Sequence, residues 1–359
     1  MVLVSEPRVF LTGFPGFLGS ALLERLLDRG DGPVACLVQP RYYGRAEQRA
    51  AEIADDASIR LYEGDITEPD LGLGDAVDDF GSVTEVYHLA AVYDLAVEAE
   101  FAESVNVRGT EHVLDFAESC GVDRFQYVST CYVSGRYDGV FTEQHLAEGQ
   151  AFNNHYERTK FEAERLVQQR MDEGLPTTIY RPAIVVGDSE TGETGKYDGP
   201  YYILRLVLAQ PAACSVLTTL PGSTDCELNV VPRDFVVDAI AALSRRDDTV
   251  DEVYQLCDPA PLSVPALLDA VEAATGHRVI SLPVPKSVTK RLMATLADRG
   301  WPAEPATVDY LDHPTRYACP NTRRALADTG IECPPAASYV DALVDFLREH
   351  PDVRSEAMS

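Results

Sequence analysis

The stretch that decides the fold of this chain is TGFPGFLG, residues 12–19. It ends a short apolar run, RVFLTG at 8–13, that is typical of a buried strand, and it opens a pattern of leucines spaced for one face of a helix. Its first glycine permits a tight turn, its second lets the backbone approach a pyrophosphate, and its third lets the helix pack on the strand. The helix N-terminus then faces the anion. The stretch therefore predicts a dinucleotide site formed by Gly13, Phe14, Pro15, Gly16, Phe17, Leu18 and Gly19. The alternative is a glycine-rich turn without a ligand.

Beyond this turn, short apolar runs continue to alternate with helical patterns. Further strands are expected at 33–38, 59–65, 85–91, 124–130 and 177–187, and long helices at 98–120 and 152–173. Such an alternation is typical of βαβ units joined in a parallel sheet. We therefore expect an α/β protein with a doubly wound sheet, the Rossmann fold.

The regular alternation of predicted strands and helices ends after residue 188, where a loop-like stretch is followed by irregularly spaced helices and strands. A chain of 359 residues is long enough for one large core and a second lobe. We expect a dinucleotide-binding core over residues 1–190, to which 225–260 return, and a smaller C-terminal substrate lobe formed by 191–224 and 261–359. Tyr197, Tyr201, Tyr202 and Trp301 are candidates either for lining a substrate pocket there or for the core of the lobe.

The chain is strongly acidic, with 58 Asp and Glu against 30 Lys and Arg and a net charge of −28. This charge repels phosphate backbones, so nucleic acid is not expected as a partner. Only four of the cations are lysines: Lys160, Lys196, Lys286 and Lys290. A dispersed, lysine-poor acidic surface suits a protein that stays soluble in concentrated salt. An arginine-preferring genome explains the same composition, and both interpretations remain open.

The cysteines and the apolar segments of the sequence indicate in which cellular compartment the protein is expected. The eight cysteines are scattered singly, without a C-x-x-C or a Cys/His cluster, which argues against a metal site and against a disulfide scaffold. The N-terminal residues show no signal-peptide pattern. The most apolar window, residues 201–220, contains Arg205 and Pro211, so we expect a buried helix and loop and no membrane span. These features predict a cytoplasmic protein.

The end of the second strand bears on the choice between the two nicotinamide dinucleotides. An NAD site usually carries an acid about 20 residues after the turn, which binds the ribose 2′-hydroxyl. The segment LVQPRYYGR at 37–45 has no acid and offers Gln39, Arg41 and Arg45. Arginine can bind a 2′-phosphate through charge-assisted hydrogen bonds, so NADP(H) is favoured over NAD(H). Alternatively, both arginines are solvated and Gln39 binds a free 2′-hydroxyl.

The third strand ends at Asp65, which is followed by Ile66 and Thr67. A carboxylate here can accept a hydrogen bond from the adenine amino group, so Asp65 and Ile66 are candidates for the adenine end of the site. An Asp in this position also commonly forms a turn with the residues that follow it. Both interpretations remain open.

Tyr156 and Lys160 lie in NNHYERTKFEAERL, residues 153–166. Residues four apart share one face of a helix. A lysine ammonium near a phenol lowers the pKa of the phenol from about 10, so that the tyrosine can act as an acid or base near neutral pH. The flanking Glu157, Arg158, Glu162 and Glu164 are expected on a solvated helix face, and the pair by itself also fits such a face.

The place of this helix in the fold supports the chemical interpretation. The helix follows the strand at 124–130, which ends in Ser129 and Thr130. Their hydroxyls can hydrogen-bond a substrate carbonyl, and ligands bind at the carboxyl ends of the strands in sheets of this kind.

The sequence resembles the extended short-chain dehydrogenase/reductase superfamily over nearly its whole length. The matching segments are TGFPGFLG (12–19), GD (64–65), HLAA (88–91), NVRGT (106–110), VST (128–130), YERTK (156–160) and RPAIVVG (181–187). The resemblance implies a catalytic set of Tyr156, Lys160 and Thr130, with Ser129 facing the interior of the fold. It also implies that Ala90 and Ala91 wall the cofactor, that Asn106 orders the neighbouring strand ends, and that Pro182 and Ile184 border the nicotinamide.

Two passages, VSTCYVSGRYDGVFTE (128–143) and YRPAIVVGDSETGETGKYDGPYY (180–202), are most similar to the branch that contains fatty acyl-CoA reductases and carrier-protein thioester reductases. Gln39 departs from this branch, which commonly has arginine there. No adenylation or carrier domain precedes the first strand, so a thioester reductase would be free-standing.

The resemblance implies an NADP(H)-dependent oxidoreductase that transfers a hydride to or from a carbonyl, with a small-molecule acyl thioester, aldehyde or ketone as partner. One alternative is an NAD-dependent sugar-nucleotide epimerase or dehydratase. Another is a non-enzymatic NADP-binding regulatory protein, although an intact Tyr156, Lys160 and Thr130 argue against it. A homodimer is expected, because two helices of the superfamily often form a four-helix interface.

Overall fold

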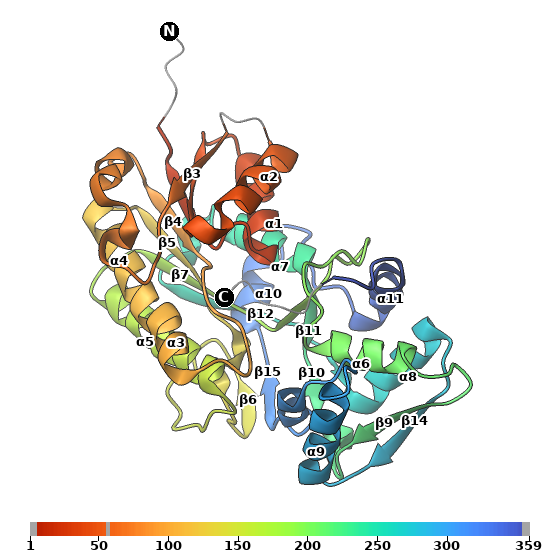
Figure 1. Cartoon of the computed structure of the whole chain (residues 1–359). Helices are drawn as coiled ribbons and strands as arrows, with labels where there is room; N and C mark the ends of the chain where they lie inside the picture. The colour runs from red at the N-terminus through yellow and green to blue at the C-terminus, as the bar shows by residue number, and fades with distance from the viewer. Residues whose placement is uncertain (1–5, 55–57, 354–359) are drawn as a thin grey trace.

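The computed structural model describes residues 6–54 and 58–353, and at its centre is a sheet of seven strands in the order β12-β7-β5-β4-β1-β2-β3 (Figure 1). The strands are β1 (Val9–Thr12), β2 (Val34–Val38), β3 (Ile59–Glu63), β4 (Glu85–His88), β5 (Arg124–Val128), β7 (Thr177–Pro182) and β12 (Glu252–Leu256). All neighbouring pairs run parallel. The predicted doubly wound α/β fold is confirmed.

Helices cover both faces of this sheet because its strands are apolar on both sides. In β1, Val9 and Leu11 belong to one hydrophobic cluster and Phe10 to another, since successive side chains point to opposite faces. The helices on the first face are α1 (Phe17–Leu27), α2 (Tyr43–Ile53) and α7 (Arg233–Leu243), and those on the second are α4 (Gly109–Cys120) and α5 (His155–Asp172). The strand order reverses between β1 and β4, which is where sheets of this kind bind ligands.

The segment predicted as one helix over 98–120 forms three pieces. A short α3 (Ala99–Ala102) continues into a π-helical stretch, Glu103–Arg108, and then into α4. Gly121 ends α4 with a left-handed φ of 62°, as a C′ glycine does. The π-helical stretch brings Asn106 against α5, where its Nδ2 donates to the Thr159 hydroxyl at 3.0 Å.

The strand predicted over 177–187 breaks at Ala183. β7 stays in the main sheet, whereas β8 (Ile184–Val186) pairs with β11 (Val230–Pro232). The amide of Ala183 still donates to Leu256 on β12 at 3.0 Å, but that of Ile184 donates to Asn229 at 3.2 Å. The change of hydrogen-bond partner leads the chain out of the core and into the lobe.

The lobe has a hydrophobic core of its own. Its elements are α6 (Pro200–Leu208), β9 (Ser215–Thr219), β10 (Glu227–Leu228), β13 (Leu262–Ser263), α8 (Val264–Thr275), β14 (Val279–Pro283), α9 (Lys286–Ala297), the 3-10 helix η8 (Pro305–Tyr310) and α11 (Val340–Glu349). Leu204, Leu268 and Val344 lie in a cluster separate from the two on the sheet. Part of the range assigned to the lobe returns to the sheet: Tyr317 and Leu326, on β15 (Thr315–Tyr317) and α10 (Pro320–Leu326), belong to the cluster under α7.

The most apolar window of the chain, residues 201–220, forms most of α6, an exposed loop and β9. The helix and the loop are as expected, but the window ends in a strand, β9, that pairs with β14. Within residues 6–54 and 58–353, no helix combines the length and the apolar character that crossing a membrane requires.

Candidate active site

The turn between β1 and α1 is tight. Gly13 has a φ of 94°, a left-handed conformation that glycine adopts readily, and its carbonyl accepts from the Gly16 amide at 2.8 Å. A Cβ at Gly19 would lie 2.4 Å from the Gly13 carbonyl oxygen, so only glycine lets α1 pack this closely on the turn. No side chain caps the start of α1. Its first amides are therefore free to bind an anion at the carboxyl edge of the sheet.

A buried chain of hydrogen bonds behind the turn joins β1, β4 and α4. The Thr12 hydroxyl accepts from the two amides after His88 and lies 2.8 Å from His88 Nδ1, so it donates to the ring. His88 Nε2 then donates at 3.0 Å to Thr110, whose hydroxyl donates to the Asn106 carbonyl. Burial, with a smaller contribution from Lys160, lowers the pKa of His88 to about 3, so the ring is neutral. His88 thus holds the strand ends together.

Asn106 lies where the resemblance implies, between the chain that follows β4 and helix α5. Its side chain accepts from the Val92 amide at 2.8 Å and donates to the Val92 carbonyl at 3.2 Å and to Thr159. These bonds tie the chain after β4 to α5. Because the side chain is only 1% exposed, Asn106 supports the cleft wall from behind.

A cleft of about 700 Å³, called here the cofactor cleft, runs from the glycine turn to Tyr156. Ser129, Thr130 and all the predicted cofactor residues except Asp65 and Asn106 line it, namely Gly13, Phe14, Pro15, Gly16, Phe17, Leu18, Gly19, Gln39, Arg41, Arg45, Ile66, Ala90, Ala91, Tyr156, Lys160, Pro182 and Ile184. Free helix amides and arginines lie toward one end, and hydroxyls and a lysine toward the other. This arrangement fits a nicotinamide dinucleotide.

Gln39 links the two groups proposed for the adenosine end. Its Nε2 donates to Asp65 at 2.7 Å, and its Oε1 accepts from Arg41 at 2.8 and 3.0 Å. The other oxygen of Asp65 accepts from the amide and hydroxyl of Thr67. Of the two interpretations of Asp65, an adenine contact and a turn, these bonds show the turn. Arg41 and Arg45 line the cleft beside it.

Helix α5 presents Tyr156 and Lys160 to the cofactor cleft. The helix begins where Asn154 caps it, since its Oδ1 accepts from the Glu157 amide at 2.9 Å. Tyr156 is 8% exposed, and Thr130, where β5 ends, is 5% exposed. Both line the same cleft, so the predicted hydroxyls and the lysine are brought together.

The pKa values of Tyr156 and Lys160 are not shifted in the way that the sequence suggested. Burial raises the pKa of Tyr156 above its ordinary value, and the Thr130 hydroxyl only partly opposes this. Burial lowers the pKa of Lys160 to about 7. Lys160 Nζ donates to the Tyr127 hydroxyl at 3.0 Å and to the Val128 carbonyl at 2.9 Å. The expectation that Lys160 lowers the Tyr156 pKa is wrong for this arrangement, because the ammonium is held by β5 and loss of water around the phenol dominates.

Two of the acids expected on a solvated helix face, Glu157 and Glu164, are instead fully buried. Glu164 forms an ion pair with Arg181 at 2.5 Å and accepts from the Ser129 hydroxyl at 2.5 Å. Glu157 accepts from the Tyr310 hydroxyl of the lobe at 2.7 Å. That expectation is wrong because α5 has protein on both of these sides, β7 on one and the lobe on the other. Ser129 is accordingly bonded toward the interior and away from a substrate.

Four residues of the site were not singled out from the sequence: Tyr93, Tyr132, Lys196 and Asp198. The Tyr93 ring packs edge-on against Tyr156, with centroids 4.8 Å apart. Lys196 forms an ion pair with Asp198 at 2.9 Å and lies 4.9 Å from the centre of the Tyr93 ring. Tyr132 lies within residues 128–143, and Lys196 and Asp198 lie within 180–202, so the resemblance of these two passages was a signal for three of the four.

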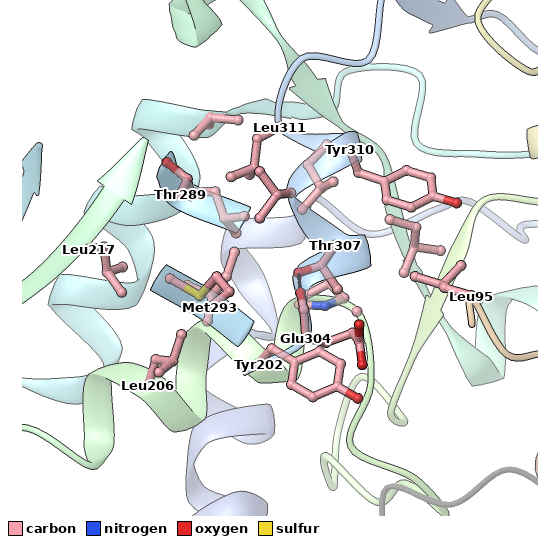
Figure 2. Close-up of a pocket in the computed structure, with 18 of the residues that line it drawn as sticks. Leu95, Tyr202, Leu206, Leu217, Thr289, Met293, Glu304, Thr307, Tyr310 and Leu311 are labelled. Carbon is pink, nitrogen blue, oxygen red and sulfur yellow. Dashed lines mark hydrogen bonds between the residues drawn. The ribbon is translucent and has the colours of Figure 1, made fainter. Parts of the chain in front are cut away.

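A second, mostly apolar pocket extends from Tyr156 into the lobe (Figure 2). Tyr93, Tyr132, Tyr156 and Ile184 line both this lobe pocket and the cofactor cleft, so the two spaces meet at Tyr156. Figure 2 shows Leu206, Leu217, Met293 and Leu311 around its inner part. Its other lining residues are Leu95, Gly199, Pro200, Tyr202, Ile203, Thr218, Thr219, Leu228, Val264, Leu267, Leu268, Thr289, Glu304, Thr307, Val308 and Tyr310.

The aromatic residues predicted either to line a substrate pocket or to pack in the core of the lobe do not all have the same role. Tyr202 lines the lobe pocket. Tyr197 and Tyr201 are at most 1% exposed and belong to the lobe core. Trp301 is 39% exposed and lines neither space.

Residues 11–240 match the family model described as male sterility protein. The chain belongs to the male sterility protein family. Among curated proteins, this member is 28% identical to the non-canonical nonribosomal peptide synthetase cpsA of Aspergillus campestris, over 70% of the chain and 26% of cpsA. It is 26% identical to the aldehyde reductase lnbA of Aspergillus flavus, over 77% of the chain and 29% of lnbA. The chain thus spans between a quarter and a third of these two relatives.

A shorter relative is the low-salt glycan biosynthesis protein Agl12 of Haloferax volcanii, which is 32% identical over 75% of the chain and 82% of Agl12. Among solved structures, the terminal R domain from the myxalamid PKS-NRPS biosynthetic pathway has a TM-score of 0.81 and 26% identity, over 97% of the chain and 92% of that domain. UDP-glucuronic acid 4-epimerase from Bacillus cereus shares the fold, with a TM-score of 0.69 and 17% identity over 98% and 99% of the two chains.

These similarities confirm membership of the extended short-chain dehydrogenase/reductase superfamily and of its thioester reductase-like branch.

Proposed function

We propose that this member of the male sterility protein family is an NADP(H)-dependent reductase of apolar carbonyl compounds, acyl thioesters or aldehydes above all. The observation that carries the proposal is the position of the Tyr156 and Thr130 side chains where a dinucleotide-sized cleft meets an apolar pocket. A hydride donor and an apolar carbonyl compound would meet at this junction.

Each part of the cofactor cleft has a role in this proposal. The free amides of the glycine turn bind the pyrophosphate, and Arg41 and Arg45 bind the 2′-phosphate that distinguishes NADP from NAD. Pro182 and Ile184 border the nicotinamide, and Lys160 holds its ribose. When bound, NADPH supplies a hydride from the nicotinamide.

Protein groups then act on the substrate oxygen. The Thr130 and Tyr156 hydroxyls donate hydrogen bonds to the carbonyl and stabilise the negative charge that develops as the hydride adds to its carbon. Tyr156 transfers its proton to that oxygen. With a thioester, the product of this step releases a thiol to leave an aldehyde, whereas an aldehyde substrate yields an alcohol.

The lining of the lobe pocket favours a substrate that has an apolar group next to its carbonyl. Leucines, isoleucines, valines and Met293 make up half of its lining residues, tyrosines add five more, and Glu304 is its one charged side chain. A hydrocarbon chain gains free energy on leaving water for such a pocket, whereas a sugar would leave hydroxyls without partners.

The sugar-nucleotide epimerase alternative is favoured by the similarity to Agl12 and by the fold shared with the epimerase. It predicts purified protein with tightly bound NAD and no need of added cofactor. The apolar lining beyond Tyr156 argues for the reductase.

The test is an NADPH oxidation screen over acyl-CoAs, aldehydes, ketones and nucleotide sugars. We expect turnover with medium or long acyl-CoAs or aldehydes. Turnover of nucleotide sugars alone, or of acyl substrates with NADH alone, would contradict the proposal.

We further propose that the protein works as a homodimer in the cytoplasm of a salt-rich cell. The excess of 58 acids over 30 cations supports this setting, because screening in concentrated salt removes the self-repulsion of such a surface. Loss of circular dichroism in dilute buffer, with recovery in molar KCl, is the expected behaviour. Full stability in dilute buffer would contradict it.

A further inference from the structure

Exposed apolar side chains are concentrated on one part of the lobe. Nine large hydrophobic residues are exposed in the described part of the chain, and six of them lie between residues 216 and 301. These six define what is called here the lobe face: Val216, Ile280, Leu282, Val288, Leu292 and Trp301. They contribute to no hydrophobic cluster and line neither the cofactor cleft nor the lobe pocket.

The lobe face is formed by β9, β14, α9 and the residues that follow α9. Val216 on β9 pairs with Ile280 on β14, and Leu282 shares the side of Ile280 because alternate residues of a strand point the same way. On α9, Val288 and Leu292 are four residues apart and share one side. α9 follows β14 directly, and Figure 1 shows these elements together at one end of the lobe.

Other residues of β9 and α9 line the lobe pocket. Leu217 on β9 does so, as do Thr289 and Met293 on α9, and Figure 2 shows all three beside it. These two elements thus contribute both to the pocket and to the lobe face, whereas no residue of β14 lines the pocket.

The charge of this region is opposite to that of the chain. Residues 278–301 carry five cations and one acid, in a chain with a net charge of −28. Lys286 and Lys290 form ion pairs with Asp309 and Asp312. The remaining cations, Arg278, Arg291 and Arg299, are exposed and form no ion pair among the described residues.

We propose that the lobe face docks the protein onto the surface of an anionic lipid bilayer. The aliphatic side chains and the Trp301 indole enter the interfacial region, and the three arginines bind lipid phosphates. An exposed indole two residues after an exposed arginine, Arg299, suits the headgroup level of a membrane. A bilayer is favoured over an acidic protein because its interface offers hydrocarbon to the aliphatic side chains and phosphate to the arginines at the same surface. The docking does not rest on the proposed function.

The first test uses Trp301, the only tryptophan of the chain, as a reporter in the lobe face. The full chain is mixed with vesicles of phosphatidylglycerol and phosphatidylcholine, or of phosphatidylcholine alone, at the lowest KCl concentration that keeps it folded. We expect flotation with the anionic vesicles, at least tenfold weaker binding to the neutral ones, and a blue shift of the Trp301 emission on binding.

Matched substitutions locate the binding surface. Leu292→Glu and Arg291→Glu should each weaken binding to the anionic vesicles several-fold. Their controls are Val140→Glu on β6 (Gly139–Phe141), where the valine is 45% exposed, and Arg323→Glu on α10, both outside the lobe face. The controls should bind as the wild type does. Circular dichroism confirms that each variant is folded.

Several results would overturn the proposal. These are no flotation with either vesicle, flotation without a change in the Trp301 emission, or flotation that Leu292→Glu leaves unchanged. A Leu292→Glu variant that halves the molar mass in light scattering while binding vesicles normally would assign the face to contact between two copies. No substrate or cofactor enters these measurements, so their failure is distinct from failure of the reductase activity.

Discussion

The cofactor cleft and the lobe pocket meet at Tyr156 but are built in different ways. The cleft is lined by short contiguous motifs at strand ends, such as residues 12–19 and the pair Ala90 and Ala91. The lobe pocket is assembled from single side chains of α6, β9, α8, α9 and η8, elements that span more than a hundred residues of sequence.

This difference separates the general chemistry from the specificity. In the proposed function, backbone amides, a tight turn and an i, i+4 pair place the dinucleotide and the proton donor, and each depends on near neighbours in sequence. The substrate contacts depend on how distant helices pack, and a leucine in that wall has no local feature that marks it. The predictions below probe the two sides separately.

The largest effect is expected at the junction itself. Tyr156→Phe removes the proton donor and should lower kcat by at least about 10²-fold while leaving the NADPH dissociation constant nearly unchanged. Steady-state kinetics and fluorescence titration of NADPH measure the two quantities. Tyr202→Phe, on the lobe pocket, is the matched control and should change kcat little. Near-normal kcat in Tyr156→Phe would remove this residue from the mechanism.

The second effect tests the adenosine end of the cofactor cleft. Replacing Arg41 and Arg45 together by Ala should raise KM for NADPH about tenfold or more and leave KM for NADH unchanged, because charge-assisted hydrogen bonds to the 2′-phosphate are lost. Arg49→Ala is the control, since this cleft arginine is already paired with Glu24 and Glu52. An equal change in both KM values would show that the arginines do not select the phosphate.

The third effect concerns the lysine of the cofactor cleft. Burial lowers the pKa of Lys160 to about 7 from an ordinary value near 10.5. Between these values the unfolded chain holds a proton that the folded chain lacks, so the free energy of unfolding should rise with pH by up to about 1.4 kcal/mol per unit.

Denaturant unfolding at pH 7, 8 and 9 measures this slope. Lys160→Met should reduce it, whereas Lys290→Met, which removes a half-exposed ion pair of the lobe, should retain it. Equal slopes in the wild type and Lys160→Met would contradict the lowered pKa.

The smallest effect tests the lobe pocket. Each added methylene of an acyl substrate should raise kcat/KM about fourfold until the pocket is full, since burying one contributes about 0.8 kcal/mol. Met293→Trp should shorten the range over which this increase holds, and Val288→Trp on the outer side of α9 is the control. If kcat/KM did not depend on the length of the acyl substrate, the acyl group would bind outside the lobe pocket.

Prediction from sequence was most reliable where geometry is local. Gly13, Gly16 and Gly19 predict their turn because the demands of that turn are set within eight residues, and Thr130, Tyr156 and Lys160 were expected together because they follow strand ends of one sheet. It was wrong for Glu157 and Glu164, whose charges suggested solvent. Their partners Tyr310 and Arg181 lie 153 and 17 residues away along the chain.

By itself, the sequence determined the doubly wound sheet, the glycine turn and the place of Tyr156 and Lys160 on one helix, because hydrophobic period, backbone freedom and helix spacing act over a few residues. Only the tertiary structure decided that Lys160 bonds Tyr127 and Val128, that the cofactor cleft opens into an apolar pocket, and that one end of the lobe exposes apolar side chains among arginines. Those features depend on burial and on contacts between distant segments, which come into existence only when the chain packs.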